Sequence, residues 1–141
     1  MPGPTVHFRM VRTIAAEEGM SASDAEAVAK ACLSVDQLWP GSIKPTRHFW
    51  PFAPLYWVPR YFGEALAARA AGDAATALTR LGWAIHGKQD SIGHGVLGLS
   101  HLRFRLGILK RDPDDWALMT PRARAAIERE THAMVRRFLA S

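Results

Sequence analysis

Residues 81–95 read LGWAIHGKQDSIGHG, and this stretch decides the fold class and the candidate site together. Its apolar residues recur at the spacing of one face of an α-helix. His86, Asp90 and His94 are four residues apart, and at about 100° per residue each such step drifts only about 40° around a helix. The stretch therefore predicts a helix that presents two imidazoles and a carboxylate on one face, with glycines that would let another backbone approach.

The rest of the chain continues this helical periodicity and shows almost no strand signal. Gly19 and Gly72 are predicted to end helices, and the Ser23–Glu26 spacing predicts a capping box. Helices are expected at residues 6–18, 24–37 and 61–71, from Asp73 through the quoted stretch toward residue 109, and from Thr120–Pro121 to about residue 139. We therefore expect a compact all-α bundle of five or six helices, forming one helical metal-binding domain over residues 1–141.

Residues 39–59 differ sharply in composition from the predicted helices. Five prolines interrupt any helix there, and six aromatic residues supply large apolar area. We expect a long loop that packs against the helical core, with a lip facing a substrate or a membrane as the alternative.

Length, charge and cysteine content narrow the class of protein. The chain has 141 residues, with 18 Lys+Arg against 13 Asp+Glu and a formal charge of +5. This balance is compatible with phosphates, nucleic acid or peripheral contact with an acidic membrane surface. A single cysteine, Cys32, excludes an internal disulfide framework and a four-cysteine zinc site, and its small neighbours predict burial rather than reactivity.

No run of about 18 apolar residues predicts a transmembrane segment. The first helical stretch carries basic residues and no apolar signal core. A cytoplasmic protein is therefore the default expectation, an exported form stays open, and the sequence does not indicate an oligomeric state.

The polar line of residues 86–94 lies inside an apolar stretch, where burying unpaired polar groups would be costly. This favours a divalent metal such as zinc over a solvated polar face, because zinc takes imidazole and carboxylate ligands. Further candidate ligands are His7, Asp36, His48, His101, Glu128 and His132. Taken singly, each of these residues is also compatible with a structural or exposed role.

The order His7, Asp36, His48, His86-x-x-x-Asp90 and His94 resembles the zinc-dependent phospholipase C and single-strand nuclease superfamily. The run L-G-x-x-I-H-x-x-Q-D-x-x-x-H looks most like its short-spaced H-x-x-x-D-x-x-x-H branch. The resemblance implies an all-α protein that binds up to three zinc ions in a cleft and hydrolyses phosphoesters.

Carried over residue by residue, the resemblance implies distinct metal positions. Asp90 would bridge toward a second metal near His7, and His94 would belong to another site completed from a later helix. For that later site the chain offers Glu128-x-x-x-His132, or His101, where the family has His-x-x-x-Asp/Glu. The family also uses an N-terminal tryptophan as a ligand, and this chain begins with Met1 instead. We therefore expect one or two zinc ions rather than three. The first metal would be held by Asp36, His48, His86 and Asp90.

These features predict a metal-dependent phosphoesterase in which metal-activated water attacks a small-molecule, lipid or nucleotide substrate. Asp90 would be the catalytic carboxylate that holds two metals around a hydroxide. Arg47 or Lys88 could bind the phosphate, and Trp50 in the aromatic segment could take a base or acyl chain.

Two other classes of function stay open. One is a metalloenzyme of different chemistry on a small metabolite or peptide, and the other is a noncatalytic helical module with a structural metal. Nucleic-acid binding through the arginines of the last helix has weaker support, because Glu128 and Glu130 interrupt them.

Overall fold

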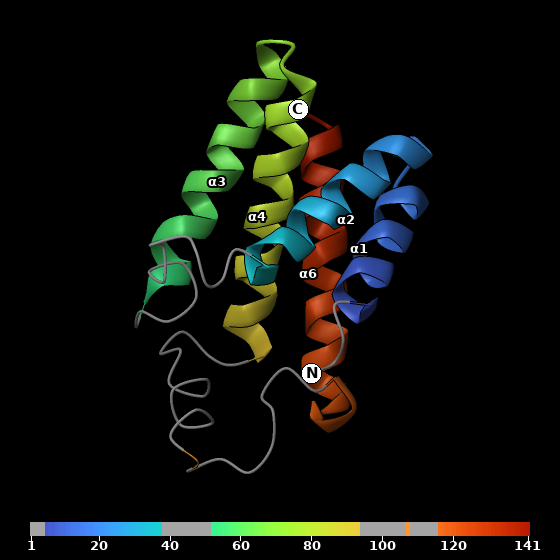
Figure 1. Ribbon diagram of the computed structural model, residues 1–141, viewed down its shortest axis with the longest axis vertical. Helices are drawn as coiled ribbons and strands as arrows, with labels where there is room; N and C mark the ends of the chain where they lie inside the picture. The colour runs from blue at the N-terminus through green and yellow to red at the C-terminus, as the bar shows by residue number, and fades with distance from the viewer. Residues whose placement is uncertain (1–4, 38–51, 94–106, 108–115) are drawn as a thin grey trace.

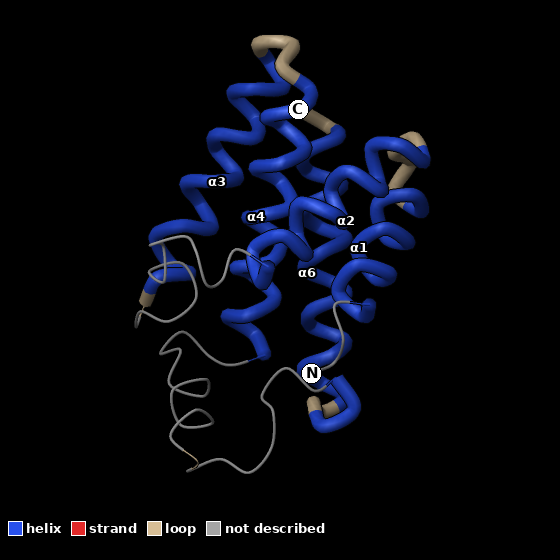
Figure 2. The backbone as a smooth tube through the Cα atoms, in the orientation of Figure 1, coloured by secondary structure: helices blue, strands red, loops and turns tan. Residues whose placement is uncertain are grey.

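The computed structural model describes residues 5–37, 52–93, 107 and 116–141, and these residues form helices and turns, without a strand (Figure 2). The all-α prediction is confirmed. None of these helices is both long enough and apolar enough to cross a membrane. The elements are α1 (Thr5–Glu17), α2 (Ala22–Gln37), α3 (Ala53–Ala70), α4 (Ala74–Gly93), the 3-10 helix η2 (Trp116–Leu118) and α6 (Pro121–Leu139).

Helix α4 is the centre of the bundle. It packs against α3, α2 and α6, whereas α1 packs against α2 and α6 at one side (Figure 1). Helices α3 and α4 form an antiparallel hairpin, and α2 packs obliquely against α4 (Figure 1). Residues on α4 can therefore meet side chains from several other helices.

Local signals set most of the helix ends as expected. Gly19 and Gly72 follow α1 and α3 in the left-handed region, with φ of 101° and 77°. The Asp73 carboxylate accepts a hydrogen bond from the Thr76 backbone N–H at 3.1 Å and so caps α4. Thr120 caps α6 in the same way, accepting from the Ala123 N–H at 3.1 Å.

The predicted Ser23–Glu26 capping box is wrong. Helix α2 begins two residues before the predicted start, and the Ser21 hydroxyl accepts the Asp24 backbone N–H at 3.1 Å. Glu26 instead pairs with Lys30 one helical turn later, at 2.6 Å. Ser21 is therefore the N-cap, because its hydroxyl is the one that satisfies a free N–H of the first turn.

Helix α3 begins inside the segment that was expected to be a loop. One proline lies in its first turn, where the missing N–H costs nothing, and Pro59 lies in its interior. Aromatic packing offsets the cost of that interior proline: Trp57 stacks on Tyr61 at 5.4 Å, and Tyr61 meets Trp83 of α4 edge-on at 5.3 Å. Tertiary contacts therefore override the local breaker in this part of the predicted loop.

Helices α2 and α4 approach each other at Gly82. A Cβ atom there would lie 2.6 Å from the Ala31 Cβ and from the Val28 carbonyl oxygen, and 2.8 Å from the Cys32 N. Only glycine allows this approach, which places Cys32 of α2 against the buried face of α4.

Candidate metal site

A buried polar cluster lies where the apolar core of α4 gives way to polar residues. His86 and Gln89 are each 2% exposed, and both follow the buried Leu81 and Ile85 on α4. Side chains from α1, α2 and α6 lie against them. Polar side chains at such depth need partners from the neighbouring helices.

The first partner is His7 of α1, which is itself buried. Its ring centroid lies 6.0 Å from that of His86, with the two planes tilted by 37°. Its Nδ1 lies 2.9 Å from the Gln89 Oε1. Two imidazoles that are 79 positions apart in the numbering therefore share one interior site.

Asp90 brings a carboxylate to the same site. Its Oδ2 lies 3.2 Å from the His86 Nε2, and the side chain is 14% exposed, so it lies at the edge of the buried region. The i,i+4 spacing noted in the sequence accounts for this pairing, since both side chains lie on one face of α4. His7, His86 and Asp90 thus offer two imidazoles and one carboxylate, which are donor types that zinc prefers.

Three further residues complete the cluster, and no motif in the sequence predicted a part for them in the site. Gln89 Nε2 donates to the Thr131 hydroxyl of α6 at 3.1 Å. The Cys32 thiol, buried as expected, lies 3.8 Å from the Gln89 Oε1 and 3.9 Å from the His86 Nδ1. A usable signal was present for one of them: Thr131 interrupts the apolar stripe that Ile127 begins on α6.

His132 takes a different place from this cluster. Its Nδ1 lies 2.7 Å from a Glu18 oxygen and its Nε2 lies 3.7 Å from Glu17, so it joins α6 to the end of α1. Hydrogen bonds from Arg136 first, and from His132 second, lower the pKa of Glu18 to about 2. The other predicted ligand of this helix, Glu128, is exposed on α6.

Of the remaining predicted metal ligands and substrate contacts, the structure describes only the side chain of Lys88. Lys88 lies 3.5 Å from Glu130 of α6. Outside the described residues lie Arg47, His48, Trp50, His94, His101 and the side chain of Asp36.

Within the described part of the chain, no group of three or more His, Cys, Asp or Glu side chains is arranged to hold a metal ion. The donor types of His7, His86 and Asp90 fit zinc, and each histidine directs its Nδ1 toward a protein partner, as metal-binding histidines do. The fit is therefore in chemistry and in supporting contacts, and a complete ligand set needs further donors.

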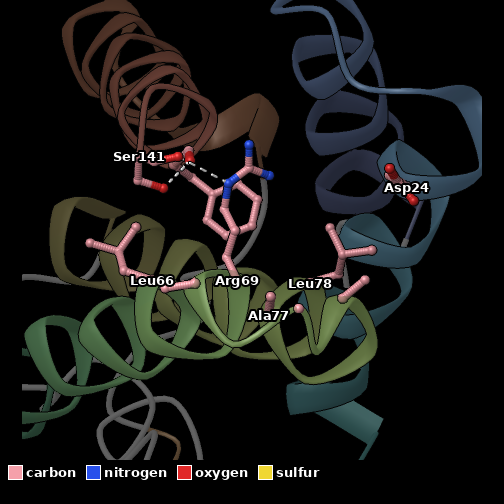
Figure 3. A pocket seen from close by; sticks show the side chains of 10 residues that line it. Asp24, Leu66, Arg69, Ala77, Leu78 and Ser141 are labelled. Atoms are coloured by element: carbon pink, nitrogen blue, oxygen red, sulfur yellow. Dashed lines mark hydrogen bonds between the residues drawn. The ribbon is translucent and has the colours of Figure 1, made fainter.

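A separate pocket of about 410 Å³ lies at the opposite end of α4, near the end of α6 (Figure 3). Arg69 donates to the Leu139 and Ser141 carbonyl oxygens at 3.3 and 3.4 Å, and its guanidinium lies over the Phe138 ring. These contacts anchor the end of α6 to α3. Among the described residues that line this pocket, none belongs to the polar cluster.

Comparison of the chain with protein-family models, with curated proteins and with solved structures found no match.

Proposed function

We propose that the chain is a metal-dependent hydrolase, with zinc as the expected metal and a phosphoester as its substrate. The observation that carries the proposal is the meeting of His7 with His86 and Asp90 in the interior of an all-α bundle. Buried imidazole and carboxylate groups need partners, and a divalent cation is a partner that all three side chains could share. Metal binding gives this arrangement a purpose that packing alone does not.

The Nε2 atoms of the two histidines and the Asp90 carboxylate are the proposed ligand atoms. His48, His94 and Asp36 are proposed as the further ligands on the basis of the sequence pattern. A divalent ion held there supplies an acidified water as nucleophile and a positive charge that stabilises the phosphoryl oxygens. Asp90 lies closest to solvent, so it is the residue proposed to face the reacting phosphate.

Substrate binding is proposed to involve residues beside the ligands. Arg47 and Lys88 are the proposed phosphate contacts, and Lys88 would exchange Glu130 for the substrate. Trp50 is proposed to take the organic part of a lipid or nucleotide ester. The exposed aromatic residues Phe52 and Tyr56 at the start of α3 support an apolar surface in this part of the chain.

The test is the metal content of the purified protein, measured by elemental mass spectrometry. Wild type is expected to hold one or two equivalents of zinc, and His86→Ala and Asp90→Asn are expected to lose it. Asp24→Asn is the matched control, because it makes the same chemical change at an exposed position at the start of α2. Phosphodiester and phosphomonoester substrates bearing p-nitrophenol are then assayed on the zinc-loaded forms.

Three outcomes would redirect or refute the proposal. No bound metal after reconstitution, with both variants folded, would refute the hydrolase. Iron or manganese at the same stoichiometry would direct the search to other metal chemistry. Zinc that is bound tightly, with no activity on any phosphoester tested, would favour a structural metal in a noncatalytic module.

A further inference from the structure

Donor and acceptor can be assigned for the hydrogen bonds of the cluster, starting from a backbone carbonyl of α6. The Thr131 hydroxyl lies 2.8 Å from the Ile127 carbonyl oxygen, one turn earlier in the same helix. A carbonyl oxygen can only accept, so the single hydrogen of that hydroxyl points at Ile127. Toward Gln89, at 3.1 Å, Thr131 can therefore only accept.

This fixes the orientation of the Gln89 side-chain amide. The group facing Thr131 must be the donor NH2, so the carbonyl oxygen Oε1 faces away from α6 toward α1. There it lies 2.9 Å from the Nδ1 of His7. Because Oε1 can only accept, the His7 Nδ1 must carry a hydrogen.

We propose that Gln89 is a positioning residue that holds His7 as its Nδ1–H tautomer and so leaves the unprotonated Nε2 as the ligand atom. The purpose assigned to this arrangement rests on the proposed metal site. The placement of the proton itself follows from the hydrogen bonds alone. In metal sites, a carbonyl that accepts a hydrogen bond from the other ring nitrogen fixes both the ring orientation and the ligating nitrogen.

Burial removes the alternatives. Thr131 is 1% exposed and Cys32 is fully buried, so water has little access to replace a lost partner of the Gln89 amide. The Cys32 thiol donates toward the same Oε1 at 3.8 Å, which adds a second, weaker donor on the side of the amide that must accept. Turning the amide over would place its NH2 against two donors, the His7 Nδ1–H and the Cys32 thiol. Its oxygen would then face the Thr131 hydroxyl, which has no second hydrogen to give.

The decisive experiment is nitrogen NMR of the metal-free, full-length chain labelled with 15N in its histidine rings. Spectra are recorded at a pH at which the rings are neutral, and His7 is assigned with His7→Gln. The expected result is a protonated, pyrrole-type Nδ1 and an unprotonated, pyridine-type Nε2. A protonated Nε2 with an unprotonated Nδ1, the form that free histidine favours, would overturn the inference.

Two substitutions at Gln89 separate its acceptor from its bulk. Gln89→Glu loses the NH2 donor to Thr131 but keeps an oxygen acceptor for the His7 Nδ1–H, so the Nδ1 hydrogen should be retained. Gln89→Leu removes the acceptor and should release His7 to the other form. With zinc as the probe, the Leu variant should bind about 10- to 100-fold more weakly than wild type. Unchanged ring nitrogens in folded Gln89→Leu would also overturn the inference.

The tautomer of His7 and the metal content test two separate proposals, so either proposal can be refuted without the other. An Nδ1–H His7 in a wild type that binds no zinc would support the role of Gln89 in placing the proton and refute the phosphoesterase. An Nε2–H His7 in a protein that binds zinc would refute the role of Gln89 and leave the phosphoesterase standing.

Discussion

The close approach of α2 to α4 at Gly82 offers a sharp test of how the site is built. Replacing Gly82 by alanine adds one Cβ atom, which would lie 2.6 Å from the Ala31 Cβ and the Val28 carbonyl oxygen. Ordinary contacts between such atoms are about 3.5–4.0 Å, so α2 and α4 would have to separate by about 1 Å. Two of the three nearest atoms belong to the α2 backbone, which cannot move aside as the end of a side chain can.

The expected cost follows from two opposing terms. Overpacking of a well-filled contact costs about 1–3 kcal/mol, and the involvement of backbone atoms places Gly82→Ala near the upper end. The gain in helix propensity from glycine to alanine offsets about 1 kcal/mol of this. We therefore expect a net loss of about 2 kcal/mol in the free energy of unfolding.

Gly63 in α3 is the matched control, because a Cβ there meets nothing within 4 Å. Gly63→Ala should therefore show only the propensity gain, a stabilisation of up to about 1 kcal/mol. Urea unfolding followed by circular dichroism measures both variants against wild type. If Gly82→Ala proved as stable as Gly63→Ala, the close approach of α2 to α4 would be refuted.

Three further predictions concern a cap, an ion pair and the thiol. Asp73→Ala should cost about 1 kcal/mol of unfolding free energy in urea titrations, since it removes the N-cap of α4, while Asp73→Asn should cost less. Because the pKa of Glu18 falls from 4.5 to about 2 in the folded chain, its contribution to stability is complete above pH 4.5 and is lost as the pH falls toward 2. Melting temperatures measured from pH 6 to pH 2 should therefore fall less steeply in Glu18→Gln than in wild type. Cys32 should react with a thiol reagent only as fast as the chain opens, so rapid labelling of the native protein would contradict its burial.

The sequence predicted the helical class and most helix ends, because these depend on local signals. Gly72 and Asp73 act through their own backbone and side-chain geometry, and both behave as expected. Helix α3 was predicted to start too late, because local rules count Pro59 as a breaker and cannot count the stacking of Trp57 on Tyr61. The chosen N-cap of α2 was wrong for a related reason, since two serines compete and only the folded backbone selects Ser21.

The candidate site was predictable only where spacing on one helix was enough. His86 and Asp90 follow from the i,i+4 rule. The proximity of His7 was inferred from the family resemblance, not from any local pattern. Thr131 could have been identified as a polar residue of the interior from its place in the apolar stripe of α6. Its partner and the part of Gln89 could not be foreseen, since an amide or hydroxyl on a helix gives no sign of which distant residue will meet it. The metal itself, the substrate and the roles of His48 and His94 stay predictions.

The hydrogen-bonded line from α6 through α4 to α1 has a consequence for how the chain acquires its site. Its two bonds join residues 42 and 82 positions apart, so neither can form locally. Contacts of such sequence separation come late in folding, because the intervening chain must lose its freedom first. Thr131 belongs to the last helix, so during synthesis from the N-terminus Gln89 has no partner on α6 until that helix emerges and docks. We expect the interior to remain hydrated until then, and a fragment ending before α6 to lack an ordered His7. Completion of the polar cluster thus reports that the whole bundle has closed.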